Sequence, residues 1–316
     1  MRLDQTLLGV AFKNPVLLAS GTCGFGEELC EVLDLSLLGG IVTKSVTLEP
    51  RSGNPSPRVV EAGNSMLNSV GLANPGLQVV CREKLPWIKE NLADIQTFIS
   101  VAGHVPDEYW SIVEGLERVG GFLGYELNLS CPNDTRLERL PFALDPDGIH
   151  EVVTGVSNLT ERPILVKLAP NVPDIGLVAE AAEAAGATGI TLVNTMPGLI
   201  VDVGTRDSAL GAGSGGLSGP ALRSVGVHAV YCAKRRTSVP LVGVGGITDA
   251  DDAIQYFLAG ASLVQIGTAT FADPRAAERV VRGLERYGKH SGVAHVKDLV
   301  GAFRGKNRQE LSGDSS

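Results

Sequence analysis

The feature that most constrains the fold of this chain is a repeated alternation between short apolar runs and longer amphipathic segments. Eight runs have the length of a strand, at residues 15–19, 40–45, 97–101, 125–129, 164–168, 190–194, 241–244 and 263–266. Segments with helical periodicity lie at 77–92, 106–119, 147–159, 174–185, 220–236, 250–259 and 274–287. This order predicts an α/β fold in which a parallel sheet closes into a (β/α)8 TIM barrel. An open, doubly wound sheet is the alternative, because periodicity does not show whether a sheet closes.

Several helix boundaries can also be predicted. Asp174 and Asp249 stand where an N-cap residue is expected, since their carboxylates can accept hydrogen bonds from the first free amides of a helix. Gly186 and Gly260 stand just after predicted helices, where glycine commonly ends a helix.

Two long inserts, 46–76 and 196–219, follow predicted strands and are rich in glycine and small polar residues. Both would leave the carboxyl ends of strands, which is the face where barrel enzymes carry their active sites. Non-helical loops of this length are usually functional or disordered. Because no linker-like segment divides the chain, we expect one barrel domain over 1–304 and a flexible C-terminal tail over 305–316.

Charge and cysteine content narrow the function classes. The formal net charge is −8 with no run of like charges, so neither nucleic-acid binding nor a basic membrane patch is indicated. No apolar stretch approaches the ~20 residues that cross a bilayer, and the N-terminal sequence leaves no room for a signal peptide. The five cysteines are scattered without metal-binding spacing, which predicts reduced thiols, no metal and a cytoplasmic protein.

The hexapeptide NLSCPN, residues 128–133, places Cys131 at the mouth of a predicted strand. Asn128 and Asn133 flank the thiol with carboxamides, and Pro132 stops the strand. A thiol in this position can react and is surrounded by groups that hydrogen-bond a planar polar ligand. The simpler interpretation is a buried structural cysteine.

Glycines gather after the last strands. Gly243, Gly245 and Gly246 end one strand, and Gly267 followed by Thr268 ends the next. The segment 216–219, GLSG, precedes a predicted helix. Loops after strands seven and eight of a barrel commonly bind phosphate through backbone amides, although each glycine alone could simply allow a tight turn. Since neither a P-loop nor a strand followed by GxGxxG is present, a mononucleotide fits better than a nucleoside triphosphate or a dinucleotide.

Two lysines lie in or at the end of apolar strands, Lys44 in IVTKS and Lys167 in ILVKL. Burying an isolated ammonium is costly, so each lysine predicts a bound anion or an electron-rich ring. A lysine whose head reaches solvent at the barrel rim is the alternative.

Carboxamides are frequent near the predicted strand ends and could together bind a small imide ring, although asparagine there is often only a turn former. They are Asn68, Asn74, Asn128, Asn133 and Asn194, the last followed by Thr195. The five histidines lie outside these motifs and are expected at the surface.

These motifs resemble those of the class 1 dihydroorotate dehydrogenases, in order and in spacing, over residues 14–274. The matching segments are TKSVTLEPRSGNPSPR at Lys44, MLNSVGLANPG at Asn68, NLSCPN, VKLAPN at Lys167, VNT at Asn194, GGLSGPA, VGVGGI and QIGTA. The resemblance is specific because the cysteine, both lysines and the glycine loops coincide.

The resemblance implies a barrel that binds FMN at the carboxyl ends of its strands, with dihydroorotate stacked on the flavin. The FMN contacts it implies are Ser20, Lys44, Ser45, Asn128, Lys167, Val193, Gly219, Gly245, Gly246, Gly267 and Thr268. The substrate contacts it implies are Lys44, Asn68, Ser69, Val70, Gly71, Leu72, Asn128, Asn194 and Thr195. Cys131 would be the catalytic base, assisted by Lys44.

The chemistry expected from the resemblance agrees with these residues. Oxidising dihydroorotate to orotate, a step of UMP biosynthesis, removes a proton from one ring carbon and a hydride from its neighbour. A thiol with an ordinary pKa of ~8.5 can serve as the base if a nearby cation lowers that value. The flavin accepts the hydride, and Lys167 would stabilise its reduced anionic form.

The subclass decides the expected partner and electron acceptor. MLNSVGLANPG, EKLPW and GGLSGPA are most similar to class 1B, whose catalytic subunit pairs with an electron-transfer subunit that carries FAD and an iron–sulfur cluster and reduces NAD. TKSVTLE, Ser100 in FISVAG, and VQIGTA are more similar to class 1A, a homodimer that reduces fumarate. We favour class 1B, and a homodimer is the family expectation in either case.

One segment departs from the family pattern. After NLSCPN, class 1B members usually continue into a glycine-rich GGxxFGTDP loop, whereas here residues 134–146 read DTRLERLPFALDP. A bulkier, charged loop could change substrate choice. Two alternatives therefore stay open: a flavoprotein of the dihydropyrimidine dehydrogenase type acting on dihydrouracil or dihydrothymine, and a non-redox phosphate-binding barrel that uses Lys167 as a base or Schiff-base amine.

Overall fold

The eight predicted strands form a closed parallel barrel. The computed structural model describes residues 1–129, 142 and 145–305. Around the barrel, each strand pairs with the next in the order β3, β4, β7, β8, β9, β10, β13, β14. Their bounds are β3 Val16–Leu18, β4 Gly40–Val42, β7 Gln96–Val101, β8 Gly124–Asn128, β9 Ile164–Leu168, β10 Gly189–Leu192, β13 Leu241–Val244 and β14 Leu263–Ile266. The predicted TIM-barrel class is confirmed, and the open-sheet alternative is wrong.

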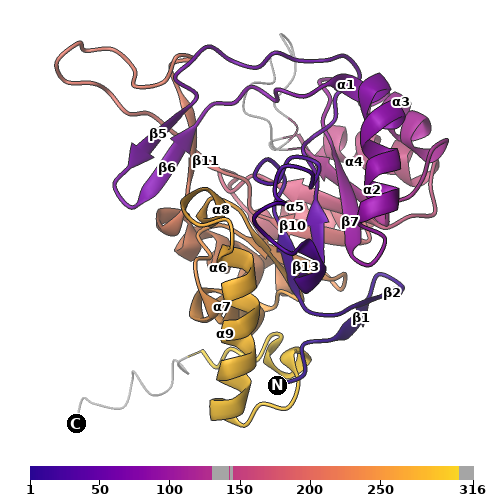
Figure 1. Ribbon diagram of the computed structural model, residues 1–316, viewed down its shortest axis with the longest axis vertical. Coiled ribbons are helices and arrows are strands. Elements are labelled where there is room, and N and C mark those ends of the chain that lie inside the picture. Colours follow the sequence, from indigo (N-terminus) through magenta and orange to yellow (C-terminus); the bar gives the residue numbers. More distant parts are fainter. Residues whose placement is uncertain (130–141, 143–144, 306–316) are drawn as a thin grey trace.

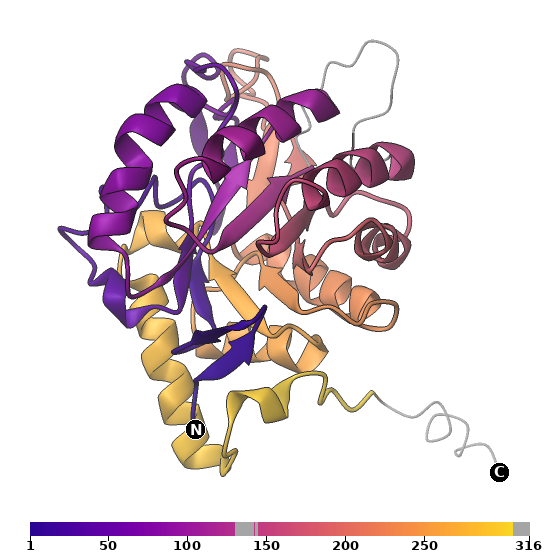
Figure 2. The same cartoon turned by 90° about the vertical axis from the view of Figure 1, so that its right-hand side faces the viewer.

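Helices surround the barrel strands (Figure 2). Their bounds are α1 Gly76–Val79, α2 Leu85–Asn91, α3 Pro106–Glu117, α4 Pro146–Ser157, α5 Ile175–Ala184, α6 Arg223–Lys234, α7 Ala250–Ala259, α8 Ala269–Ala272 and α9 Ala276–Ser291. A π-helical turn, Val80–Lys84, joins α1 to α2. Short 3-10 turns lie at Leu35–Leu37, Pro220–Leu222 and Val296–Leu299.

Two of the predicted helix starts are capped as expected. The Asp174 carboxylate accepts hydrogen bonds from the amides of Gly176, at 2.9 Å, and Leu177, at 3.2 Å, and so begins α5. Asp249 caps α7 by accepting from the amide of Asp252 at 3.0 Å. Gly260 ends α7 with a φ of +127°, a conformation that other residues rarely adopt.

The two long inserts form a second sheet that the sequence does not predict. It is antiparallel, in the order β11 (Met196–Gly198), β12 (Gly215–Ser218), β6 (Ser65–Asn68) and β5 (Val59–Ala62). The central pair brings Leu217 opposite Leu67. Figure 1 shows β5, β6 and β11 projecting to one side of the barrel. The prediction of plain loops is wrong here because the pairing joins segments about half a chain apart, which local periodicity does not report.

The opposite end of the barrel is closed by an N-terminal hairpin of β1 (Gln5–Leu7) and β2 (Val10–Phe12). The Gln5 side chain donates to the Ser262 carbonyl, just before β14, and the Gln96 side chain at the start of β7 donates to the Ala11 carbonyl. Phe12 packs into a small core with Leu17 and other inward residues of the barrel strands. The hairpin lies well away from β5 and β6 (Figure 1), so the second sheet and the hairpin occupy different ends.

Hydropathy gives no sign of a membrane-crossing segment in the structure. Within the described ranges, none of the helices combines the length and the apolar character that spanning a bilayer requires.

A cluster of hydrogen bonds around Glu117 joins α3 to the barrel. The Glu117 carboxylate accepts from Tyr125 Oη at 2.8 Å, from Thr160 Oγ1 at 2.6 Å and from Arg162 Nε at 3.0 Å. Partial burial alone would raise the pKa of Glu117, but these hydrogen bonds and the Arg162 charge outweigh it and lower the pKa below its ordinary value of 4.5.

The Glu117 cluster predicts how stability depends on acid. A carboxyl group with a lowered pKa in the folded state contributes stability that is complete above its ordinary pKa and is lost as pH falls through the folded pKa. We expect Glu117→Gln to lower the free energy of unfolding by about 1–2 kcal/mol at pH 7. The loss should shrink as pH falls below about 4.5, measured by urea unfolding at several pH values. If the free energies of unfolding of wild type and Glu117→Gln differed by the same amount at pH 7 and in acid, this role of Glu117 would be contradicted.

Candidate active site

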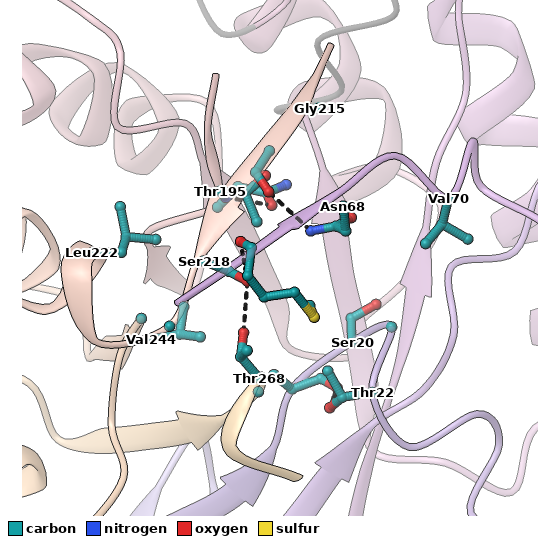
Figure 3. A pocket seen from close by; sticks show the side chains of 18 of the residues that line it. Ser20, Thr22, Asn68, Val70, Thr195, Gly215, Ser218, Leu222, Val244 and Thr268 are labelled. Atoms are coloured by element: carbon teal, nitrogen blue, oxygen red, sulfur yellow. Dashed lines mark hydrogen bonds between the residues drawn. The ribbon is translucent and has the colours of Figure 1, made fainter. Parts of the chain in front are cut away.

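A cavity of about 890 Å³ opens at the carboxyl ends of the barrel strands, beside the second sheet. Its volume lies within the ~300–1,000 Å³ typical of small-molecule and cofactor sites. Side chains from the barrel ends, among them Ser20 and Thr268, and from the second sheet, among them Asn68 and Ser218, surround one space (Figure 3). The second sheet therefore forms part of the site.

Of the FMN contacts, substrate contacts and catalytic residues that the resemblance implies, all but one line this cavity. They are Ser20, Lys44, Ser45, Asn68, Ser69, Val70, Gly71, Leu72, Asn128, Lys167, Val193, Asn194, Thr195, Gly219, Gly245, Gly246, Gly267 and Thr268. The exception, Cys131, lies outside the described residues, as do Asn133 and most of the atypical segment 134–146. The residues that line the cavity are spread over more than 200 positions of the chain, from Ala19 to Ala272, and the barrel topology brings them together.

Lys44 follows β4 and lines the cavity wall. Among the described residues its ammonium makes no hydrogen bond or ion pair. Burial lowers the pKa of Lys44 because it removes part of the hydration of the charged form. A partly buried ammonium that has no partner among the described residues favours binding of an anionic or electron-rich ligand in this cavity.

Lys167, in β9, does have a negative partner within the protein. Its Nζ lies 3.2 Å from Oε1 of Glu126, a fully buried residue of β8. The prediction that burial of Lys167 requires a bound anion or an electron-rich ring is therefore wrong, because the chain supplies a carboxylate itself. The FMN contact of Lys167 stays a prediction. The signal was present in the sequence, since Glu126 is a charged residue inside an apolar strand, and it was missed.

Both oxygens of the Glu126 carboxylate accept hydrogen bonds. Besides Lys167, Thr191 Oγ1 donates to its Oε2 at 3.1 Å and Gln265 Nε2 donates to the same oxygen at 2.7 Å. Donors from β9, β10 and β14 thus converge on one carboxylate from β8. Such convergence offsets the cost of removing the charge from water.

The predicted carboxamides divide into two groups. Asn194 Nδ2 donates to Asn128 Oδ1 at 3.2 Å, and Asn68 Nδ2 donates to the Gly216 carbonyl at 3.1 Å, all beside the cavity. Asn74 instead is buried, donates to Thr47 Oγ1 at 2.7 Å and accepts from the Gly76 amide at 2.8 Å. Asn74 therefore shapes a turn, and its predicted place at the mouth is wrong.

The glycine loops meet at one end of the cavity. Gly246 has a φ of +66°, and a Cβ there would lie 2.7 Å from the Gly219 carbonyl oxygen, so the two loops touch through backbone. Thr268 Oγ1 donates to Ser218 Oγ at 2.7 Å (Figure 3). Within the described residues, the amides of Gly246 and Thr268 donate to no protein group. Unpaired amides beside glycine turns suit a phosphate.

Hydroxyl groups form a short chain on another wall. Ser45 Oγ lies 2.8 Å from Ser100 Oγ, which is fully buried, and 3.5 Å from Ser20 Oγ. Ser20 and Ser45 line the cavity, so the chain links its surface to the barrel interior.

The prediction that all histidines are surface residues is wrong for His104. His104 lines the cavity, and its Nε2 contacts Arg51 Nη2. It stands three residues after β7, at the carboxyl end of a strand, which is the signal that could have identified it. Arg51 and His104 belong to the cavity wall although neither was a candidate.

Comparisons with known proteins agree with this geometry. The family model described as dihydroorotate dehydrogenase matches residues 2–287. The chain is 41% identical over 305 residues to the catalytic subunit of dihydroorotate dehydrogenase B (NAD(+)) of Pelobacter propionicus, covering 96% of this chain and 99% of that protein. It is 44% identical over 305 residues to a protein of Solibacter usitatus provisionally named dihydroorotate dehydrogenase A (fumarate), again covering 96% and 99%.

A solved structure shows the same fold. The crystal structure of DHODH from Eimeria tenella in complex with ferulenol superimposes with a TM-score of 0.79 at 24% identity. The match covers 95% of this chain and 88% of the other.

Proposed function

The chain belongs to the dihydroorotate dehydrogenase family, and from this membership we propose that it oxidises dihydroorotate to orotate in pyrimidine biosynthesis with FMN as its cofactor. The observation that carries the proposal is that every described residue that the resemblance implies as an FMN or substrate contact lines one cavity, although these residues were chosen from the sequence. When bound, FMN supplies the acceptor for the hydride.

The residues present fit FMN. The glycine loops at Gly219, Gly246 and Gly267 offer backbone amides to one phosphate group. Lys167 would lie near the isoalloxazine ring, where its positive charge favours the anionic reduced state. A cavity of about 890 Å³ has room for both the cofactor and a small pyrimidine.

The substrate assignment rests on Lys44 and the carboxamides. Dihydroorotate carries a carboxylate that dihydrouracil and dihydrothymine lack, and Lys44 is a partly buried cation without a partner among the described residues. Asn68, Asn128 and Asn194 would hydrogen-bond the imide edge of the ring through paired donors and acceptors. The unpaired cation favours dihydroorotate over the neutral dihydropyrimidines.

The non-redox alternative is less well supported. An isomerase or aldolase that used Lys167 as a base or Schiff-base amine would need that lysine neutral. Lys167 Nζ instead lies 3.2 Å from the buried Glu126 carboxylate, a partner that competes with such a role.

Cys131 is the proposed base on sequence grounds, since it lies outside the described residues. It would take the proton while the hydride leaves the neighbouring carbon, and Lys44 would orient the substrate for both transfers.

The proposed electron acceptor is NAD, since several relatives are named as NAD(+)-type catalytic subunits. We propose that the electrons reach NAD through an electron-transfer subunit with FAD and an iron–sulfur cluster, as the resemblance to class 1B implies. Fumarate is the alternative, favoured by the fumarate-type name of one relative. In either case we propose a homodimer in the cytoplasm.

Anaerobic mixing tests the proposal. We expect the purified protein to hold FMN and dihydroorotate to bleach its flavin absorbance rapidly, whereas dihydrouracil does not. Bleaching by dihydrouracil alone would select the dihydropyrimidine alternative. A protein that binds no flavin would contradict both redox assignments and leave the phosphate-binding barrel.

A further inference from the structure

Glu126 lies beneath the candidate active site and has no role in the function proposed so far. Its side chain is 0% exposed, and it does not line the cavity. Lys167, Thr191 and Gln265 all donate to it, and of these only Lys167 lines the cavity. The group therefore joins the barrel interior to the cavity floor through the Lys167 ammonium.

A buried ion pair such as Lys167–Glu126 contributes little to the stability of a fold. A buried ion pair recovers little more than the cost of desolvating its two charges, and apolar side chains of similar volume often stabilise a core better. The inward residues that pack with Phe12 of the N-terminal hairpin, such as Leu17, Phe98 and Leu165, are indeed apolar. A charged and polar cluster that reaches the cavity through Lys167 points to a role in that cavity.

We propose that Glu126 is a positioning residue that holds the Lys167 ammonium at the cavity floor and offsets its charge, and so sets how strongly the site stabilises a reduced flavin. This inference rests on the proposed function, because it requires a flavin above Lys167. A hydride carries two electrons and a proton, so a bound flavin that accepted one from the substrate would become an anion, while the second proton would go to the base. A neighbouring cation favours that anion, and a carboxylate paired with the cation opposes it.

Glu126→Gln tests the charge while keeping the shape. The Oε1 atom of Gln265 is buried without a hydrogen-bond partner among the described residues. If the side-chain amide of Gln265 flips by about 180°, its Oε1 can accept a hydrogen bond from the side-chain NH2 of the glutamine at position 126. Lys167 can still donate to the side-chain carbonyl oxygen of that glutamine. The variant then closes the same network without a negative charge.

The readout is the midpoint potential of bound FMN, measured by anaerobic titration against a dye of known potential. We expect Glu126→Gln to shift the reduction equilibrium at least tenfold toward the reduced flavin, which is a rise of about 30 mV for a two-electron couple. Glu117→Gln is the matched control, because Glu117 also accepts hydrogen bonds from three side chains, but none of those side chains lines the cavity. Its midpoint potential should stay within a twofold change of the equilibrium.

A second pair of variants tests the same role of Glu126 if the Glu126→Gln protein does not bind flavin. Lys167→Gln leaves the Glu126 charge unopposed, whereas Lys167→Gln with Glu126→Gln leaves no charge. We expect the single variant to disfavour the reduced flavin at least tenfold more than the double variant does.

The outcomes separate this inference from the proposed function. An unchanged or lowered potential in Glu126→Gln, or equal potentials in the second pair, would overturn the role of Glu126 even if dihydroorotate reduces the wild type. A wild-type protein that binds FMN but is not reduced by dihydroorotate would overturn the substrate alone, because the titration needs no substrate. A wild type that binds no flavin overturns both.

Discussion

Cys131→Ala is expected to slow the bleaching of bound flavin by dihydroorotate by about 10²- to 10⁴-fold, which is the usual contribution of a positioned general base. The proton on the substrate carbon must leave as the hydride does, and alanine offers no group that can take it. The measurement is the anaerobic rate of absorbance loss in a stopped-flow instrument. In the wild type this rate should rise with pH as the thiol ionises, and in the variant the rise should disappear.

Two controls separate a lost base from a damaged site. Reduction of the Cys131→Ala flavin by dithionite should proceed as in the wild type, because it bypasses the substrate. Cys232→Ala, which changes a thiol on α6 away from the cavity, should bleach at the wild-type rate. Cys23 cannot replace the base, since burial, reinforced by nearby carboxylates, raises the pKa of its thiol to about 12. Equal bleaching rates in wild type and Cys131→Ala would remove Cys131 from its role.

The barrel could be predicted from the sequence because each of its signals is local. Three predicted strands, 164–168, 241–244 and 263–266, have the observed bounds, and the others differ from the observed strands by at most three residues at either end. The second sheet could not be predicted in the same way. Its register places Leu67 opposite Leu217, and nothing in the sequence around either residue specifies a partner so far along the chain.

In the candidate site too, residues marked by local sequence position could be predicted, and residues whose role depends on distant contacts could not. Lys44, Asn128 and Gly246 could be predicted because each stands at or just beyond the carboxyl end of a strand, where position alone implies the cavity. Glu126 was missed because its meaning depends on contacts: its donors stand 41, 65 and 139 residues away. The sequence shows a charge in an apolar strand, but the identity of its partner requires the closed barrel.

Gly246→Ala is expected to weaken FMN binding by about tenfold to a hundredfold. The φ of Gly246 is +66°, and an added Cβ would lie 2.7 Å from the Gly219 carbonyl oxygen and 2.9 Å from the Arg223 amide nitrogen. Both are backbone atoms, so the loops must separate, and both loops belong to the proposed phosphate site. Losing one hydrogen bond to a charged group costs about 1.5–3 kcal/mol, and each 1.4 kcal/mol is about tenfold in affinity.

Gly63→Ala provides the matched control for backbone strain. Gly63 has nearly the same conformation, with a φ of +64°, but an added Cβ would meet nothing within 4 Å, and the residue lies in the turn between β5 and β6. Both variants should lose about 1–2 kcal/mol of stability from the left-handed conformation. Only Gly246→Ala should also release flavin, as followed by flavin fluorescence during dilution of the loaded protein. Equal retention of FMN by the two variants would mean that contact between the Gly246 and Gly219 loops does not hold the phosphate.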